Sequence, residues 1–207
     1  MSGLAAGIRL AMFDKKVLIV EKHVEIGGLN SFYIRKKRTF DVGLHAMTNY
    51  TPKGVRTSPL GKLLKQLRFR HEDFRLCAQT LSEVRFPEKA LRFTNEFEFF
   101  EQEVAEQFPQ QMDGFRKLLK IIREFDELDL NNHQRLSARK VLETHLTDPQ
   151  LIDMLFCPLM YYGSADEDDM DFYQFVIMFK SVFIEGFCRS QGWDPHQAER
   201  NLPYGYP

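Results

Sequence analysis

The stretch SGLAAGIRLAMFDKKVLIVE, residues 2–21, decides the fold class. Its first half has the composition of a helix and places the small residues Gly3, Ala6 and Gly7 on a face that can approach a sheet closely. Two lysines then lead into Val17–Val20, four apolar residues in a row, three of them β-branched. Such a run is typical of a parallel strand that is buried on both faces. The stretch therefore predicts an α/β fold.

Glu21 follows the apolar run directly, at the carboxyl end of the predicted strand, where open α/β sheets bind ligands. A dinucleotide requires backbone N–H groups at a helix N-terminus for its pyrophosphate. It also requires glycines at the turn and, about 20 residues downstream, a carboxylate for the adenosine ribose. Gly3 and Glu21, 18 positions later, match this spacing. A generic βα unit that ends in an acidic residue matches it equally well.

The continuation of the sequence decides between these two interpretations. Gly27-Gly28 follows Glu21 by six residues, and the segments GLNSFY and FDVGLHAMTNY come after it. With these segments, residues 2–50 resemble the N-terminal FAD-binding segment of the flavin amine oxidase superfamily. The resemblance is strongest to its phytoene-desaturase-like branch, which includes carotenoid desaturases and isomerases and retinol saturases.

The resemblance implies FAD as the cofactor and gives residues their roles. Gly3 corresponds to the third glycine of the family's G-x-G-x-x-G turn, and Glu21 to the carboxylate that binds the ribose. Gly27-Gly28 corresponds to a pair near the pyrophosphate and ribityl chain, and Asp41-Val42-Gly43 resembles an FD-x-G element that brings backbone near the flavin. The predicted cofactor contacts are Ser2, Gly3, Leu4, Glu21, Lys22, Gly27, Gly28, Leu29, Asn30, Ser31, Gly43, Leu44 and His45. For His45, an ordinary polar loop histidine is the favoured interpretation, and a residue that positions the substrate or tunes the flavin ring is the alternative.

The sequence departs from the family pattern at both ends. The family has a buried strand and two more glycines where this chain has only Met1-Ser2, and it continues for several hundred residues more. We therefore expect a fragment, truncated at both ends, in which the first Rossmann strand is missing. Without that strand, the N–H and C=O groups of Val17–Val20 need other partners, which costs stability. We expect weak FAD binding, or none, from these residues alone.

Three regions are predicted along the chain. Residues 1–54 form a partial Rossmann-like segment, residues 55–188 part of a largely helical α+β substrate domain, and residues 189–207 a disordered tail. The predicted elements after the first strand are a hairpin of 31–34 and 39–42, a helix at 58–67, two strands within 82–94, a helical region at 97–128 broken at Phe108-Pro109, helices at 137–145 and after Thr147-Asp148-Pro149, and a buried helix at 171–187. The aromatic segments 155–162 and 172–187 fit a core, or the apolar polyene tunnel that the resemblance implies.

Composition narrows the choice of partners. The net charge of -1 gives no support to nucleic-acid binding. Three widely spaced cysteines fit reduced thiols in the cytoplasm, and neither the histidines nor the acidic run at 166–169 has the spacing of a metal site. No apolar stretch is long enough to span a bilayer. The basic run Arg35–Arg38 is either a solvated turn or a patch for anionic lipid headgroups.

The function that the resemblance implies is an oxidoreductase that desaturates or isomerises an extended hydrophobic substrate, carotenoid-like or retinoid-like, by hydride transfer to flavin. A lipophilic substrate also implies peripheral contact with a membrane. No catalytic residue can be named from the sequence. An amine-oxidase-type flavoenzyme is a second interpretation, and a truncated remnant without activity is a third.

Overall fold

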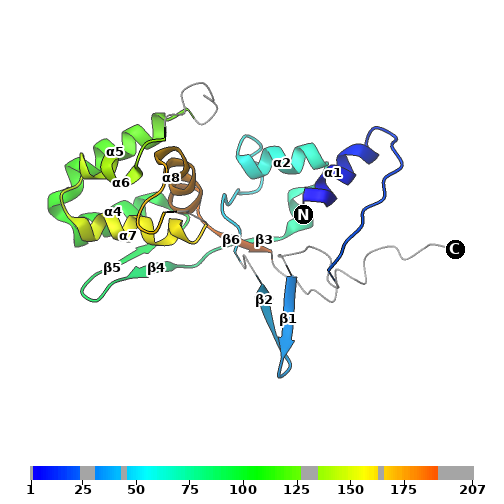
Figure 1. Cartoon of the computed structure of the whole chain (residues 1–207), viewed down its shortest axis with the longest axis horizontal. Helices are drawn as coiled ribbons and strands as arrows, with labels where there is room; N and C mark the ends of the chain where they lie inside the picture. Colours follow the sequence, from blue (N-terminus) through cyan, green and yellow to red (C-terminus); the bar gives the residue numbers. More distant parts are fainter. Residues whose placement is uncertain (1, 24–30, 43–45, 127–134, 163–165, 191–207) are drawn as a thin grey trace. The chain divides into compact units, whose positions relative to one another are not determined.

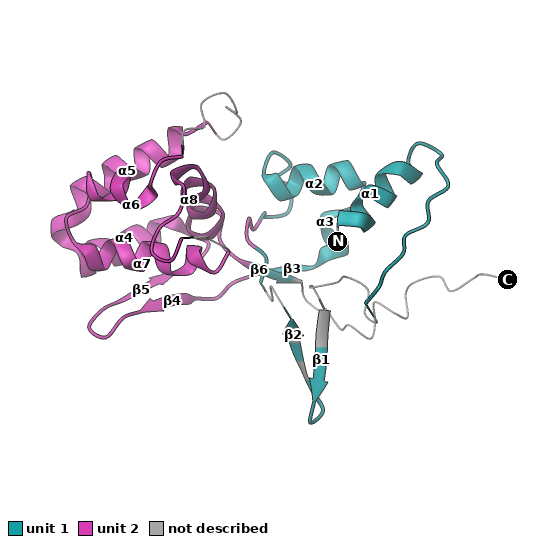
Figure 2. Cartoon of the chain, viewed as in Figure 1, with its two compact units in different colours: residues 1–47, 51–77, 188–207 teal, residues 48–50, 78–187 magenta. Residues whose placement is uncertain are grey.

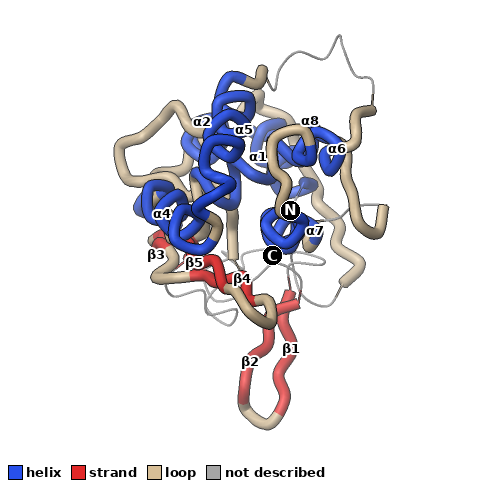
Figure 3. The backbone as a smooth tube through the Cα atoms, turned by 90° about the vertical axis from the view of Figure 1, so that its left-hand side faces the viewer, coloured by secondary structure: helices blue, strands red, loops and turns tan. Residues whose placement is uncertain are grey.

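The structure is a computed structural model, and it describes residues 2–23, 31–42, 46–126, 135–162 and 166–190. The chain divides into two compact units (Figure 2): residues 1–47, 51–77 and 188–207 form unit 1, and residues 48–50 and 78–187 form unit 2. Both helices and strands are present, so the predicted mixed α/β content is confirmed (Figure 3). The predicted domain boundaries at 54 and 188 stay predictions, because the two units reflect packing alone.

Unit 1 consists of short helices and small sheets. Its described elements are α1 (Ser2–Ala11), β1 (Ser31–Arg35), β2 (Arg38–Val42), α2 (Pro59–Leu67), α3 (His71–Phe74), most of β3 (Leu76–Ala78) and β6 (Cys188–Ser190). The predicted hairpin is confirmed, since β1 and β2 pair antiparallel with Tyr33 opposite Phe40. β3 and β6 form a second two-stranded sheet that the sequence did not predict. Arg189 and Ser190 therefore belong to a strand rather than to the predicted tail, whose residues 191–207 lie outside the described chain.

The predicted parallel strand at Val17–Val20 is wrong for the described chain, where these residues belong to none of the sheets. Their side chains nevertheless alternate in exposure: Val17 and Ile19 are 38% and 45% exposed, and Leu18 and Val20 are 87% and 82% exposed. A period of two is typical of extended backbone. The segment is therefore extended but unpaired. The physical reason is that a strand needs a neighbouring backbone to satisfy its N–H and C=O groups, and no described strand offers one.

Unit 2 is mostly helical. Its described elements are β4 (Ser82–Arg85), β5 (Ala90–Phe93), α4 (Phe97–Gln107), the 3-10 turn η1 (Pro109–Gln111), α5 (Met112–Glu124), α6 (Ala138–Glu143), α7 (Pro149–Met160), α8 (Phe172–Phe179) and the π-helical turn η2 (Lys180–Ile184). The predicted break at Phe108-Pro109 is confirmed, because α4 ends and η1 begins there. The single helix predicted at 171–187 is α8 followed by η2.

A phenylalanine-rich core holds unit 2 together. The rings of Phe100 and Phe183 stack with their centroids 4.4 Å apart, and Phe179 lies 5.0 Å from Phe183. These side chains and Phe175 are less than 2% exposed. The rings fill the space between the helices, so the core interpretation of the aromatic segment 172–187 is confirmed. The apolar polyene tunnel that the resemblance implies stays a prediction.

The acidic run at 166–169 leads into α8, as expected of a helix-entry loop. Asp169 accepts hydrogen bonds from the Arg139 N–H at 2.9 Å and from Ser137 Oγ at 2.6 Å. Asp171, two residues further on, is the N-cap of α8 and accepts from the Tyr173 N–H. These carboxylates therefore serve to begin α6 and α8.

Glu103 is a buried carboxylate on α4 whose partner comes from β5. Its side chain is 5% exposed. Arg92 Nε donates to Glu103 Oε2 at 2.9 Å, and the Arg92 backbone N–H donates to the same oxygen at 3.2 Å. The side-chain hydrogen bond from Arg92 lowers the pKa of Glu103 below its ordinary value, despite the burial of the carboxylate. The pair therefore ties the hairpin of β4 and β5 to α4.

We expect Glu103→Gln to lower the free energy of unfolding by about 1–2 kcal/mol at pH 7, because a charged hydrogen bond near the core is lost. A lowered folded-state pKa means that the contribution of Glu103 is present above the unfolded value of about 4.3 and disappears as the pH falls through the folded value. Urea unfolding at pH 7, pH 5 and below pH 4 measures this. The difference in the free energy of unfolding between the original chain and Glu103→Gln should become smaller below pH 4. Glu88→Gln, at an exposed residue in the β4–β5 turn, is the control, and an equal loss in both variants would contradict the role of the pair.

Candidate dinucleotide site

α1 and the extended segment that follows it form the candidate site. The helix closes with a turn in which the Lys15 N–H donates to Leu10 O at 3.3 Å, and Asp14 adopts a left-handed φ of 55°. The chain then turns back and runs toward the end at which the helix starts (Figure 1). A helix with an extended segment running back beside it is the arrangement that the sequence predicted, without the sheet around it.

Gly7 is the point of closest approach between the two. A Cβ atom at Gly7 would lie 2.6 Å from Ile19 Cδ1 and 3.4 Å from Val17 Cγ1. The two side chains therefore occupy the space that a side chain at position 7 would need. The predicted small-residue face is confirmed at Gly7, which is buried, whereas Gly3 and Ala6 are exposed. Gly7 was not among the predicted cofactor contacts; its place in the small-residue face was the signal for its packing role.

This contact sets the level of Glu21 relative to the helix. Glu21 lies two residues beyond Ile19, and Gly3 lies four residues before Gly7. Two residues of extended chain cover roughly 6.6 Å. Four residues of helix cover about 6 Å. Because the two run in opposite directions, Glu21 comes to the N-terminal end of α1, the end that carries Gly3.

The electrostatics of this end suit an anion and a hydroxyl group. The exposed Glu21 carboxylate accepts the His23 N–H at 2.9 Å, and this bond lowers the pKa of Glu21 below its ordinary value. An exposed glutamate is ionised at neutral pH in any case. The first turn of α1 contains no acidic residue, and its backbone N–H groups carry the positive end of the helix dipole. An added Cβ at Gly3 would meet no atom within 4 Å. The residues present therefore fit the adenosine diphosphate half of a dinucleotide.

The other predicted contacts are only partly described. Of the predicted set, Ser2, Gly3 and Leu4 lie in the first turn of α1, Glu21 and Lys22 end the extended segment, and Ser31 begins β1. Gly27, Gly28, Leu29, Asn30, Gly43, Leu44 and His45 lie outside the described residues. Their roles stay predictions. Within the described ranges, no group of three or more His, Cys, Asp or Glu side chains is arranged to hold a metal ion, and no helix has the length and apolarity needed to cross a membrane.

Comparisons with known proteins bear on the same region. Residues 1–60 match the family described as an NAD(P)-binding Rossmann-like domain. The chain is 29% identical over 140 residues to chloroplastic prolycopene isomerase 1 of an Oncidium hybrid cultivar, covering 64% of this chain and 23% of that protein. It is 30% identical over 115 residues to the chloroplastic prolycopene isomerase of Arabidopsis thaliana, covering 55% and 19%, and 41% identical over 54 residues to that of Daucus carota, covering 26% and 9%.

The resemblance to the phytoene-desaturase-like branch is confirmed. The matched region spans less than a quarter of the length of these relatives. No solved structure matches the chain. The Rossmann-like match is therefore a match of sequence. Among the described residues the structure has the helix, the extended segment and the hairpin, and Val17–Val20 belong to no sheet.

We expect Gly7→Val to separate the extended segment from α1, because two more methyl groups and a Cβ would collide with Ile19 and Val17. Overpacking of this kind costs about 1–3 kcal/mol, so tryptic cleavage after Lys22 should accelerate by about fivefold or more. Limited proteolysis followed by mass spectrometry measures the rate. Ala6→Val, at the exposed neighbouring residue, is the matched control. If both variants are cleaved as slowly as the original chain, Gly7 is not the contact that holds the segment.

Proposed function

We propose that residues 1–60 hold the adenosine diphosphate half of FAD for an oxidoreductase that desaturates or isomerises an extended hydrophobic substrate of the carotenoid kind. The observation that carries the cofactor part is the packing of Ile19 on Gly7, which brings an ionised carboxylate to the N-terminal end of α1. The relatives are prolycopene isomerases, and this supports the carotenoid part of the proposal. An amine-oxidase-type flavoenzyme and a remnant without activity are the alternatives.

In this proposal each part of the site has one task. The backbone N–H groups of the first turn of α1, at Ser2, Gly3 and Leu4, bind the pyrophosphate. The Glu21 carboxylate accepts hydrogen bonds from the ribose hydroxyls. Gly7 keeps these two groups at a fixed distance by holding the segment against the helix. FAD, when bound, supplies the acceptor for the hydride that leaves the substrate.

The choice of FAD over a nicotinamide dinucleotide rests on the double glycine Gly27-Gly28 and the segments after it. The Glu21 carboxylate alone does not distinguish FAD from NAD, because the adenosine ribose of NAD also needs a carboxylate as hydrogen-bond acceptor. It does disfavour NADP, since a carboxylate repels a 2′-phosphate. A comparison of the affinities for FAD, NAD and NADP therefore tests whether the site prefers FAD to the nicotinamide dinucleotides.

We expect the purified chain to bind FAD weakly but saturably, and Glu21→Gln to weaken this binding by about tenfold, the effect of losing a hydrogen bond to a charged acceptor. Quenching of flavin fluorescence during titration with protein measures the affinity. ADP should compete and NADP should not. Glu88→Gln, which removes one exposed carboxylate from unit 2, is the matched control. An absence of saturable quenching favours the remnant, and an equal loss in both variants excludes Glu21 as the ribose ligand.

We also propose that the hairpin of β1 and β2 makes the peripheral membrane contact. Tyr33 and Phe40 stack with their centroids 5.2 Å apart while remaining 52% and 41% exposed. The four basic residues 35–38 at the tip are exposed, and Lys36 and Lys37 have φ values of 49° and 62°. Asn and Gly are the residues that a turn of this backbone favours. The sequence thus keeps cations at a tip where they strain the backbone, beside aromatic rings suited to the headgroup region.

We expect the double variant Lys36→Asn, Lys37→Gly to bind anionic vesicles about 30-fold more weakly, because each lysine near such a surface contributes about 1 kcal/mol. The replacements suit the left-handed turn, so a loss of binding cannot be attributed to a damaged hairpin. Co-sedimentation with phosphatidylcholine vesicles, with and without phosphatidylserine, measures binding. Lys117→Ser, Lys120→Ser on the exposed face of α5 is the control of equal charge. Retention of binding in the hairpin variant would assign membrane contact elsewhere.

A further inference from the structure

A cavity of about 440 Å³ lies within unit 1, between the loop at 53–56, α2 and the start of α3. This volume falls in the range of about 300–1,000 Å³ typical of small-molecule sites. Its lining combines two kinds of side chain. The apolar ones are Val55, Leu64 and Phe69, and the cationic ones are Lys53, Arg56, Lys65, Arg68 and Arg70, with Glu72 as the one carboxylate among the lining residues.

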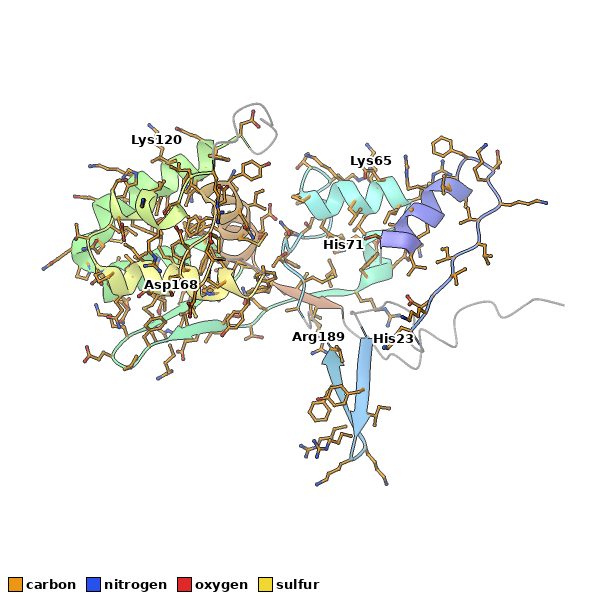
Figure 4. The ribbon with its side chains drawn as sticks, viewed as in Figure 1. His23, Lys65, His71, Lys120, Asp168 and Arg189 are labelled. Carbon is orange, nitrogen blue, oxygen red and sulfur yellow. The ribbon has the colours of Figure 1, made fainter. Side chains whose placement is uncertain are left out.

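The walls of the cavity are held by specific contacts. Ser58 is the N-cap of α2, and its Oγ accepts a hydrogen bond from the Gly61 N–H at 3.1 Å. The same Oγ lies 2.8 Å from Thr51 Oγ1. His71 Nε2 lies 2.7 Å from Thr51 O and so joins the loop to α3. A Cβ at Gly61 would lie 2.6 Å from Val55 O, so the loop backbone rests directly on the helix. Figure 4 marks Lys65 on α2 and His71 on α3, the two helices that border the cavity.

Positive charge is in excess around this cavity. Lys53 pairs with Glu72 at 2.7 Å, and Arg70 pairs with Asp73 at 2.8 Å. Arg56, Lys65 and Arg68 form no ion pair with any residue that the structure describes. The C-terminus of α2 offsets part of this charge, but a helix end supplies only about half a negative charge. Three cations at this partly apolar cavity are therefore not balanced by any carboxylate in the part of the chain that the structure describes.

We propose that this cavity binds a small organic phosphate, with the phosphate among Arg56, Lys65 and Arg68 and an apolar group against Val55, Leu64 and Phe69. A phosphate monoester carries about −1.5 to −2 charge at neutral pH, which suits several cations better than a single carboxylate does. Guanidinium groups present paired N–H donors that match phosphate oxygens. The site uses no residue of α1 or Glu21, so it is separate from the proposed dinucleotide site.

The test uses hexyl phosphate as the probe, in calorimetric titration of the whole chain. We expect binding of one molecule per chain, at least tenfold tighter than that of inorganic phosphate or hexanol, because both halves of the cavity are then used. The double variant Arg56→Gln, Arg68→Gln should weaken binding by about 30-fold or more, since each arginine contributes a charged hydrogen bond. Both side chains are exposed, and circular dichroism checks that the variant is folded. Lys36→Asn, Lys37→Gly removes the same charge from the hairpin and should leave hexyl phosphate binding unchanged.

Two further arms identify the source of the phosphate. The hairpin has its own attraction to anionic vesicles, so this arm uses the hairpin variant as the background. Residual binding of that variant to phosphatidic acid vesicles, abolished when Arg56→Gln, Arg68→Gln is added, identifies a lipid headgroup. Binding of hexyl phosphate that such vesicles do not compete for identifies a free metabolite. Glu21→Gln should keep hexyl phosphate binding even if FAD binding fails. The inference is overturned if no heat of binding is seen, if the arginine variant binds normally, or if the Glu21 variant loses binding.

Discussion

The contact between Gly7 and the side chains of Val17 and Ile19 is the constraint on which the candidate site depends. Because a Cβ at position 7 would lie 2.6 Å from Ile19 Cδ1, a glycine lets the extended segment approach the helix without displacing that side chain. The opposite directions of helix and segment then bring Glu21 to the helix N-terminus. The position of Glu21 therefore follows from the course of the backbone. The two backbone directions, together with the absence of a side chain at position 7, place Glu21 at the level of the first turn of α1.

The helices and hairpins were predictable because their patterns are local. Ser58 before Pro59 and Asp148 before Pro149 are start signals that the structure uses as N-caps. The predicted strand at Val17–Val20 was wrong. A row of apolar residues indicates burial, but a strand also needs a neighbouring strand for its backbone hydrogen bonds. α3, β3 and β6 were missed, since elements of three or four residues are too short to show a period.

The candidate site divides in the same way. Gly3 and Glu21 could be proposed from spacing, because a helix and a returning segment have fixed rises per residue. Gly7 stood in the predicted small-residue face, yet its burial against Ile19 could be known only from the packing. The cavity beside α2 could not be foreseen at all. Its cations, Arg56, Lys65 and Arg68, follow no motif, and they come together through the way the loop at 53–56 folds onto Gly61.

The alternating exposure of residues 17–20 has a consequence for how the protein behaves at high concentration. An extended, apolar and unpaired backbone is a template on which another molecule can add a strand. The exposed side chains of Leu18 and Val20 give such a molecule an apolar surface to pack against. The charged residues on either side, Lys15 and Lys16 before the run and Glu21 and Lys22 after it, act as gatekeepers against this kind of aggregation. Glu21, the proposed ribose ligand, thus also opposes aggregation through the neighbouring apolar run.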